Sequence, residues 1–338
     1  MLEPRIGHGR GASVGVRSSR CTAVLFVLGV CVFLGVTACS SEKNAAAPSG
    51  PAGPGKVVVE QRGYLVAIPL DGSHHVRLAK LPGDDPAISR AGSRVAFAAD
   101  SGISIMRIDG SHIRPVTHGD DGSPSWSADG QRLYFVRYFT SHECGSIFSV
   151  AVSGGTVGRI GDPSKVVAPG HFHSYQDPAV SPDGTRIAFS DWAGCADAGG
   201  FVSPRLRVVD LKGRPTDDLG ELARNGFYPD PEHSGPAWSP DGTELAYRHN
   251  SDLAVANRDG SDERILIHGG SSIYEAPVWS PDGAWIAFTR GTDSAVNIVE
   301  VVHPNGSSRR VIAHANHWPA IAGWLPASSE AHSSGGNG

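Results

Sequence analysis

The chain has 338 residues, which fits one large domain with short appended segments. Glycine (43 residues) and proline (24 residues) are frequent and only 19% of the residues are charged, a composition that favours many short strands joined by tight turns. The formal net charge is -5 and the pI is about 6.3, so the chain lacks the basic footprint that binding to nucleic acid phosphates requires. Nucleic acid is therefore excluded as the expected partner.

The N-terminal segment has the charge order of a signal peptide. Four arginines and one acidic residue lie within residues 1–20, and an uncharged apolar stretch follows over residues 21–38. The stretch is long enough to span a membrane, so an uncleaved signal anchor is the alternative interpretation. Val36-Thr37-Ala38-Cys39 favours cleavage, because it resembles the lipobox of bacterial lipoproteins, in which the cysteine sulfur is alkylated with diacylglycerol.

By that resemblance, residues 1–38 are a lipoprotein signal peptide and Cys39 is the lipidated first residue of the mature protein. Two acyl chains on one residue satisfy the two-signal condition for stable anchoring. Residues 39–55 are rich in Ser, Ala, Pro and Gly, so they cannot bury enough surface to fold and are predicted to be a flexible tether. The expected location is the extracytoplasmic face of a cell membrane, held there by lipid.

A repeated motif fills most of the remaining chain. Four segments read, with small variations, Pro-x-Trp-Ser-Pro-Asp-Gly followed by an alternating apolar strand. A fifth segment keeps the Pro, Ser and Gly but loses the Pro-Asp pair, and a sixth keeps only the Trp-x-Pro core. The segments begin, in chain order, at Asp85, Ser123, Asp177, Gly235, Ala276 and Ala322.

Each repeat predicts four strands. The Trp or another apolar residue ends a short inner strand, and Pro-Asp-Gly makes a tight turn in which Pro fixes φ and Gly supplies a positive φ. A second tight turn follows two strands later, as at Asp109-Gly110 and Asp259-Gly260. Four strands per repeat is the pattern of a β-propeller blade.

The repeat resembles the WD40-like repeat of TolB-type propellers over residues 56–327, and the resemblance implies that its Trp, Asp and Gly residues are architectural. We predict an all-β fold, a six-bladed propeller with four-stranded blades. Nothing after Trp324 could complete a blade, so the last blade is expected to be closed by strands from residues 57–78 at the N-terminal end. Residues 328–338 are expected to be a disordered tail. The predicted inner-strand positions are Ile88, Trp126, Val180, Trp238, Trp279 and Trp324.

Four long segments interrupt the repeat, at residues 137–145, 161–176, 190–204 and 220–234. In a propeller blade, the connections before strand one and between strands two and three fall on one face, and the two tight turns fall on the other. The four segments are therefore predicted to share one rim, over blades two and three and the entry to blade four. Long loops gathered on one rim of a rigid scaffold commonly carry function.

The binding-site candidates are histidine and aromatic side chains of this rim. The histidines could bind a divalent metal or an anionic ligand, but they lack a fixed-spacing motif such as His-Glu-x-x-His, and solvated histidines are the alternative. The aromatic side chains form either a surface for peptide or glycan, or the packing between loops. No cofactor is expected, with a divalent metal as the alternative. The rim candidates are His142, His171, His173, Tyr175, Trp192, Tyr228 and His233.

Cys144 and Cys195 are the two cysteines that remain after Cys39 in the mature chain. Both are predicted to lie between strands two and three of neighbouring blades, in a compartment that permits oxidation. A disulfide between them is therefore predicted.

The sequence favours a non-catalytic binding or scaffold module that presents a propeller face to a protein or cell-envelope partner. Gly-x-Ser-x-Gly does not occur after Cys39, and neither does a phosphate-binding loop. The alternative is an enzyme whose site lies on the propeller rim, a metal-assisted lyase or hydrolase acting on polysaccharide.

Overall fold

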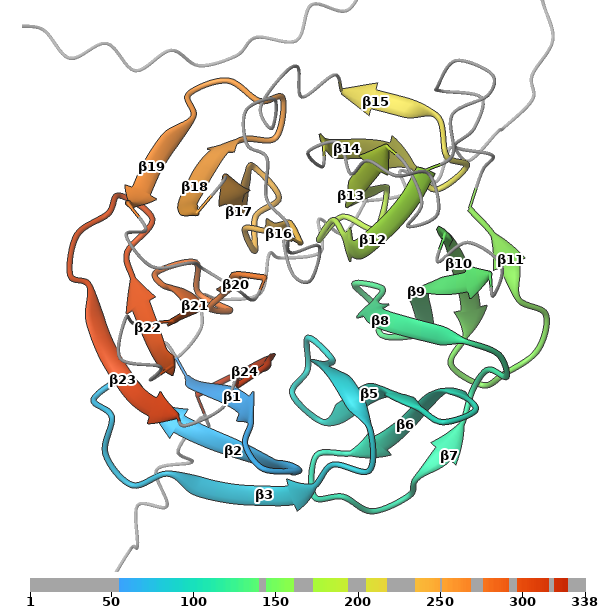
Figure 1. Cartoon of the computed structure of the whole chain (residues 1–338), viewed down its shortest axis with the longest axis horizontal. Helices are drawn as coiled ribbons and strands as arrows, with labels where there is room; N and C mark the ends of the chain where they lie inside the picture. The colour runs from blue at the N-terminus through green and yellow to red at the C-terminus, as the bar shows by residue number, and fades with distance from the viewer. Residues whose placement is uncertain are drawn as a thin grey trace, which may run out of the picture. The chain divides into compact units, whose positions relative to one another are not determined.

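The computed structural model describes residues 55–139, 144–160, 173–193, 205–217, 235–249, 251–268, 276–291, 297–315 and 319–327. All of them belong to the compact unit over residues 48–338. The described residues form six four-stranded antiparallel sheets, which stand around a ring like the blades of a propeller (Figure 1). Within these ranges there is no helix with the length and apolarity needed to cross a membrane.

The blades are numbered here from the first complete repeat. Blade 1 contains β4 (Asp84–Ile88), β5 (Arg94–Ala99), β6 (Gly102–Arg107) and β7 (Arg114–Pro115). Blade 2 contains β8 (Asp121–Trp126), β9 (Arg132–Phe139), β10 (Cys144–Ala151) and β11 (Gly158–Arg159). Blade 3 contains β12 (His173–Val180), β13 (Arg186–Ala193), β14 (Arg205–Asp210) and β15 (Pro215–Asp217).

The other three blades follow the same order from the inner strand outward. Blade 4 contains β16 (Ala237–Trp238), β17 (Glu244–His249), β18 (Asp252–Asn257) and β19 (Arg264–Ile267). Blade 5 contains β20 (Val278–Trp279), β21 (Ile286–Gly291), β22 (Asn297–Val302) and β23 (Arg310–Ala315). Blade 6 contains β24 (Ile321–Leu325), β1 (Lys56–Glu60), β2 (Tyr64–Pro69) and β3 (Val76–Lys80).

Blade 6 joins the two ends of the propeller. The inner strand β24 pairs antiparallel with β1, with Lys56 opposite Leu325 and Val57 opposite Trp324. This pairing confirms the predicted closure, and it gives both edge strands a partner within the ring. The six-bladed, all-β architecture is likewise confirmed.

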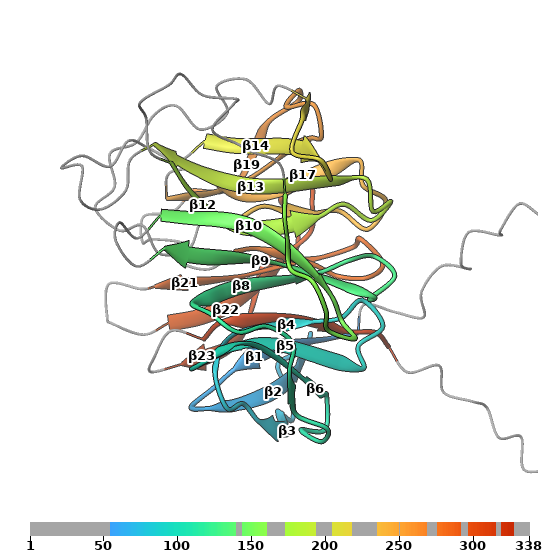
Figure 2. The same cartoon turned by 90° about the vertical axis from the view of Figure 1, so that its right-hand side faces the viewer.

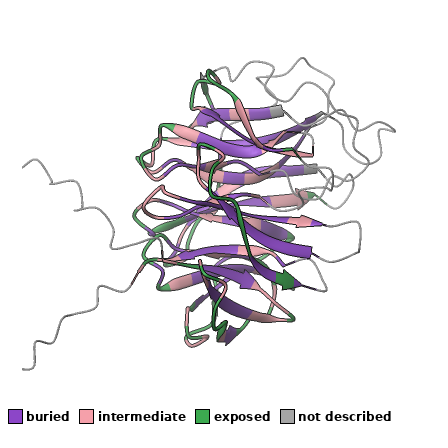
Figure 3. Ribbon diagram, turned by 90° about the vertical axis from the view of Figure 1, so that its left-hand side faces the viewer, coloured by how far each residue is buried: buried purple, intermediate pink, exposed green. Residues whose placement is uncertain are grey.

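The hydrophobic core lies between adjacent blades. Between blades 1 and 2, for example, Ala96 and Ile103 pack with Trp126 and Phe135, and each of these side chains is at most 8% exposed. Each blade thus buries one sheet face against each neighbour, which explains the near-continuous apolar runs in the second and third strands. In Figure 3 the buried residues run through the middle of the blades and the exposed ones lie at the turns.

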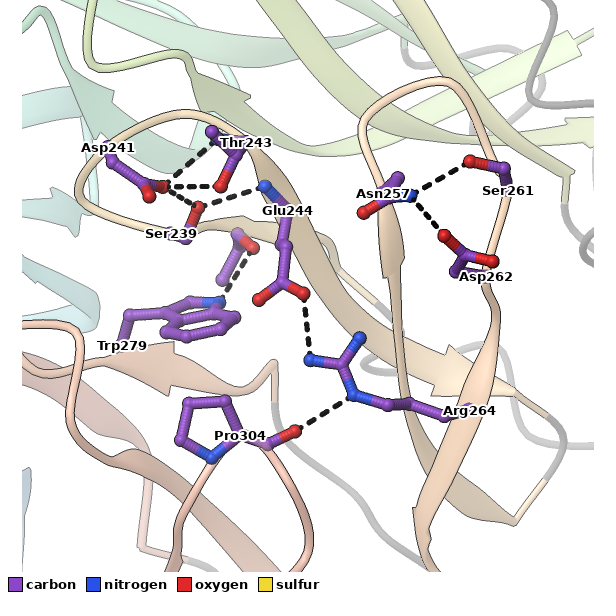
Figure 4. A network of polar contacts seen from close by, with 11 residues as sticks. Ser239, Asp241, Thr243, Glu244, Asn257, Ser261, Asp262, Arg264, Trp279 and Pro304 are labelled. Carbon is purple, nitrogen blue, oxygen red and sulfur yellow. Dashed lines mark hydrogen bonds and ion pairs between the residues drawn. The ribbon is translucent and has the colours of Figure 1, made fainter. Parts of the chain in front are cut away.

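Tryptophan side chains link the inner strands of successive blades. Trp279 Nε1 of blade 5 donates a hydrogen bond to the Ala237 carbonyl of blade 4, at 3.1 Å (Figure 4). Four blades have such a bond, and each time the acceptor is the carbonyl of the residue directly before the inner-strand position of the preceding blade. The same bond joins Trp126 to Ala87 (2.9 Å), Trp238 to Ala179 (3.0 Å) and Trp324 to Val278 (3.0 Å). Val180 and Ile88 have no indole N–H, so the junctions of blades 2 and 3 and of blades 6 and 1 are held in other ways.

The Ser-Pro-Asp-Gly turn is fixed by its own side chains. In blade 4, Ser239 Oγ donates to Asp241 Oδ1 at 2.6 Å and accepts from the Glu244 amide at 2.9 Å (Figure 4). Burial alone would raise the pKa of Asp241, but hydrogen bonds from Ser239 and Thr243 outweigh it and hold the pKa below its usual value. The ionised carboxylate therefore supports the turn above the unfolded-state pKa of about 3.9, and this support is lost as the pH falls through the lower folded-state pKa.

The degenerate turn of blade 1 keeps the backbone geometry without the aspartate. The Gly92 amide donates to the Ser89 carbonyl at 2.7 Å, and Ser89 Oγ accepts from the Arg94 amide at 3.1 Å. Arg90 stands where the other repeats have Pro or Ala, and its Nη2 donates to the Pro240 carbonyl of blade 4 at 3.3 Å. The loss of Pro-Asp thus leaves the turn intact and places a cation there.

The connections sort onto two faces. The tight turns between strands one and two and between strands three and four lie on one face, here called the turn face. The starts of the inner strands and the connections between strands two and three lie on the other, the loop face (Figure 2). The strand ends that border the long insertions, such as Phe139, His173 and Ala193, are all at the loop face. The insertions themselves lie largely outside the described residues, so their sorting onto one rim stays a prediction.

We predict that Trp279→Phe lowers the free energy of unfolding by roughly 1–3 kcal/mol, because it leaves the enclosed Ala237 carbonyl without its donor. Trp285→Phe is the matched control, since Trp285 is also 8% exposed and also lies in the core between two blades, but its ring packs against His303 and Arg310 of its own blade. Urea unfolding of both variants measures the effect. If both variants lose the same free energy of unfolding, the hydrogen bond from Trp279 Nε1 contributes nothing beyond the volume of the side chain.

Candidate functional site

A central channel with a volume of about 1090 Å³ lies between the six inner strands. All six blades contribute to its wall through β4, β8, β12, β16, β20 and β24 and the residues that flank them. Among the described residues that line it there is no histidine, cysteine or lysine. The polar groups of these lining residues are carboxylates, hydroxyls, the Gln176 amide and the Arg90 guanidinium, and aromatic rings lie beside them.

Three lining residues on adjacent blades have an unusual backbone conformation. Asp85, Ser123 and Asp177 have φ values of 48°, 47° and 51°, and each directly precedes a proline. The register between strands one and two shifts at each of these positions, which marks a β-bulge. A positive φ costs energy for a residue with a Cβ, and bulges next to binding sites re-aim side chains. Here they place three polar side chains at the loop-face mouth of the channel.

Hydrogen bonds join these three residues into one acidic group. The Ser123 amide donates to Asp85 Oδ2 at 3.0 Å, and Ser123 Oγ donates to Asp177 Oδ1 at 3.5 Å. Ser123 of blade 2 thereby bridges carboxylates from blades 1 and 3, and Asp120 lies in the same wall. The mouth is consequently negative on the side of blades 1 to 3.

The opposite half of the mouth carries no charge at the equivalent positions. These are Gly235, Ala276 and Ile321 in blades 4, 5 and 6. A Cβ at Gly235 would lie 2.5 Å from the Asp177 Cβ, so only glycine allows blade 4 to approach the carboxylate this closely. At these described positions, the mouth is therefore polar on the side of blades 1 to 3 and apolar on the side of blades 4 to 6.

Tyr138 adds an aromatic hydroxyl to the acidic half. Burial raises its pKa to about 12, the charge of Asp177 contributes further, and a hydrogen bond with Ser123 acts in the opposite direction. The hydroxyl therefore stays protonated at physiological pH. It serves this site as a hydrogen-bonding group, and it is not a general base.

Trp192 occupies in β13 the place that Tyr138 occupies in β9, each five residues after the first core residue of its strand (Leu133 and Ile187). It lines the same channel and is only 5% exposed. Among the described residues its Nε1 has no hydrogen-bond partner. Blade 3 thus contributes Trp192 to the mouth, and blade 2 contributes Tyr138 and its neighbour Phe139.

Known structures share this architecture. TolB from Acinetobacter baumannii is 17% identical, with a TM-score of 0.58 over 81% of this chain and 68% of that one. A putative TolB from Agrobacterium tumefaciens is 15% identical, with a TM-score of 0.55 over 79% of this chain and 90% of that one. The fold is a TolB-like β-propeller. A chain of a nidogen/laminin complex is also similar, at 12% identity and a TM-score of 0.57, over 79% of this chain and 98% of that one.

Sequence comparisons cover only parts of the TolB-like propeller. The family model described as the dipeptidyl peptidase IV (DPP IV) N-terminal region matches residues 208–322, which span blades 4 and 5 and parts of their neighbours. Uncharacterized protein Atu1656 of Agrobacterium fabrum is 31% identical over 154 residues, 43% of this chain and 46% of that protein. The match therefore spans less than half the length of that relative.

The structure describes the side chains of two of the predicted rim candidates, Trp192 and Tyr175. Trp192 lines the channel mouth, as described above. Tyr175 is 4% exposed and packs edge-on against Phe189, with ring centroids 5.2 Å apart, so its ring is enclosed by the core between blades 2 and 3. His173 begins β12, but its side chain is outside the described part. His142, His171, Tyr228 and His233 lie outside the described residues, as do Cys39 and Cys195.

A divalent metal is the alternative ligand that the rim histidines suggest. No group of three or more His, Cys, Asp or Glu side chains that could hold a metal ion occurs within the described ranges. The predicted metal alternative therefore depends on histidines that lie outside them.

Four residues of the mouth, namely Asp85, Ser123, Tyr138 and Asp177, were not among the rim candidates. Asp85 and Ser123 stand directly before the first proline of their repeats, where blades 4 and 5 have Gly235 and Ala276. A polar residue before proline in three successive repeats is the signal that could have identified them.

We predict that Asp177→Asn lowers the pKa of Tyr138 from about 12, because the variant removes a negative charge that disfavours the phenolate. Alkaline titration by ultraviolet absorbance, with Tyr138→Phe to identify the signal, measures the shift. Asp100→Asn changes the same charge on an exposed residue of blade 1 and is expected to leave the titration unchanged. An unshifted Tyr138 in Asp177→Asn would contradict the described proximity of the two side chains.

Proposed function

We propose that this protein is a membrane-anchored extracytoplasmic lipoprotein whose propeller is a non-catalytic binding module. Its partner is a protein or a cell-envelope polymer, which docks at the loop-face mouth of the central channel. The rim candidates contribute further contacts around this mouth. They are His142, His171, His173, Trp192, Tyr228 and His233.

The observation that carries this proposal is the asymmetry of the mouth. Asp85, Ser123 and Asp177 are held on one half by strained bulges, with Tyr138 and Trp192 beside them. Rigid polar and aromatic groups reduce the ordering cost of binding, because their conformations are set before a ligand arrives. Carboxylates flanked by aromatic rings suit a ligand that offers hydrogen-bond donors or positive charge.

The similar structures support a binding role. TolB proteins and a chain from a complex of nidogen with laminin share the fold, so the architecture is one that occurs in a protein assembly. The described members of the acidic group include no histidine or cysteine, so the alternative of a metal-assisted rim enzyme would depend on histidines outside the described residues. Metal analysis of the purified mature protein distinguishes the two, since the enzyme requires stoichiometric metal that depends on His171 and His173.

The position of the chain ends is compatible with anchoring. Lys56, the first residue of β1, lies opposite Leu325, the last residue of β24, and both are at the turn face. A tether over residues 39–55 would therefore join the propeller at the face opposite the mouth. A partner would approach the mouth without passing the attachment point.

We predict that Asp85→Asn combined with Asp177→Asn abolishes capture of the partner that the wild-type protein retains from solubilised cell envelope. Asp84→Asn combined with Asp100→Asn removes two exposed carboxylates from the same blade region without touching the channel wall, and should leave capture unchanged. Both variants are checked for an unchanged melting temperature. Full capture by a folded Asp85→Asn and Asp177→Asn variant would remove the mouth from the proposed function.

We predict that Cys39→Ala blocks lipid attachment and leaves an unprocessed precursor, because the lipobox supplies only this sulfur for alkylation. Metabolic labelling with a radioactive fatty acid, followed by gel analysis, measures both effects. Cys31→Ala, in the apolar stretch, is the control and should be labelled and processed normally. A labelled and cleaved Cys39→Ala variant would exclude the proposed anchor.

We predict a disulfide between Cys144 and Cys195 in the exported protein. Cys144 begins β10, and Cys195 follows the end of β13 by two residues. The Gly145 amide donates to Ser174 Oγ of β12 at 3.1 Å, and β12 pairs with β13, so the loop-face ends of blades 2 and 3 are adjacent. Thiol titration of the denatured, unreduced mature protein should find no free thiol. Two free thiols would reject the pairing.

A further inference from the structure

The turn face carries its exposed charges unevenly. Arginines that form an ion pair with a carboxylate are not counted here. Over blades 5, 6 and 1, the described exposed residues of this face then include six basic side chains and two carboxylates, Asp71 and Asp109. We call this region the basic sector. Its basic side chains are Lys56, Arg77, Arg90, Arg107, Arg114 and Arg310.

The other half of the same face has the opposite balance. Ion-paired arginines such as Arg214 are again not counted. Over blades 2, 3 and 4, the described exposed residues include four basic side chains, namely Arg132, Arg159, Lys212 and Arg258. Six exposed carboxylates accompany them, and these are Asp129, Asp183, Asp241, Asp259, Asp262 and Glu263. Among these exposed residues, only the half over blades 5, 6 and 1 has more basic side chains than carboxylates, although the whole chain has a formal net charge of -5.

Exposed apolar side chains occur in the same place. Val76 of blade 6, Ile113 of blade 1 and Val311 of blade 5 are 43%, 54% and 43% exposed, and each lies within one residue of the turn-face start of an outer strand. Each is directly next to an arginine in the sequence: Arg77, Arg114 and Arg310, respectively. The corresponding stretch of blade 4 has Asp262 and Glu263 instead. Three neighbouring blades therefore repeat one pairing of an exposed aliphatic side chain with a cation.

The basic sector is centred on blade 6, where the chain enters and leaves the propeller. Lys56 and Leu325 are paired there at the turn face. A lipid anchor preceding residue 55 would bring this part of the propeller closest to the bilayer.

We infer that the basic sector binds the anionic headgroups of the membrane that holds the lipid anchor. The inference rests on the proposed anchoring at Cys39, and it adds the orientation of the propeller to it. Basic side chains near an anionic lipid surface are attracted to it, and aliphatic side chains beside them enter the interfacial region. The turn face then rests on the membrane and the loop-face mouth points away from it.

An acidic protein would also be attracted by six cations, but the repeated aliphatic neighbours favour lipid. Single exposed valine and isoleucine side chains on three separate blades form no continuous pocket for a partner's side chains. Each of them suits shallow insertion between headgroups, which needs no pocket.

The test uses the mature chain with Cys39→Ser, which has no lipid, in sedimentation with vesicles of equal parts phosphatidylglycerol and phosphatidylcholine. The chain should bind these vesicles, release them as salt is raised, and ignore pure phosphatidylcholine. Lys56→Glu combined with Arg107→Glu should weaken binding by about 25-fold or more, at about fivefold for each cation removed from the surface. Val76→Asn combined with Ile113→Asn should weaken it as well.

Lys212→Glu combined with Arg258→Glu is the matched control, because it makes the same charge change on the same face over blades 3 and 4. It should weaken binding less than threefold, and all variants must keep the wild-type melting temperature. The inference is overturned if the unlipidated chain ignores anionic vesicles, or if the control loses as much binding as the sector variant. The inference is also overturned if the chain binds polyglutamate as tightly as it binds the vesicles and the Val76→Asn and Ile113→Asn changes do not weaken that binding. The partner of the basic sector would then be an acidic protein. Because no lipid is attached in this assay, these outcomes are independent of fatty-acid labelling at Cys39.

Discussion

A propeller must hold each inner strand to the next one around a ring that has no central helix or ligand to pack on. In blades 4 and 5 the inner strands β16 and β20 are only two residues long, so their ladders alone supply few hydrogen bonds. The indole N–H of the repeated tryptophan supplies the missing link, since it reaches the backbone of the preceding blade. The spacing of successive blades follows from this contact, and the diameter of the channel follows from the spacing.

The two junctions that lack the indole show what replaces it. At the junction of blades 6 and 1, Gly323 has a φ of 139°, and a Cβ there would lie 3.2 Å from the Ile88 Cβ, so the backbones approach directly. At the junction of blades 2 and 3, the inner strands β8 and β12 are six and eight residues long. Their extra length carries the chain to the bulges at Ser123 and Asp177. The part of the ring that departs most from the repeat is therefore the part that builds the acidic mouth.

The repeat also explains why the two faces differ. The tight turns need Ser, Asp and Gly for their own hydrogen bonds, and this leaves only the neighbouring positions, such as Arg107 and Arg310, free to vary in charge. The loop face has no such requirement, so insertions and polar bulge residues accumulate there. In our account the loop face recognises a partner and the basic half of the turn face meets the membrane.

The fold could be predicted from the sequence because its determinants are local. Pro-Asp-Gly favours a turn wherever it occurs, and the repeats count out six inner strands, the last of which, at Trp324, pairs with β1. The mouth could be predicted only in part. Trp192 was identified from its insertion, but Asp85 and Ser123 were not, because their direction depends on a positive φ that the sequence does not require of a non-glycine residue. Tyr175 shows the reverse case, since the period of two in β12 turns its ring into the core.

The central claim is that the two ends of the propeller close one ring, and hydrogen exchange of the β1 amides tests it most directly. Val57, Val58 and Val59 are at most 1% exposed and pair with β2 on one side and β24 on the other. We expect the β1 amides to exchange as slowly as the amides of the second strands of blades 4 and 5. We also expect Trp324→Gly to accelerate exchange of the β1 amides more than that of the β17 amides in blade 4. Exchange of wild-type β1 at the rate of an unpaired strand would contradict the closed ring.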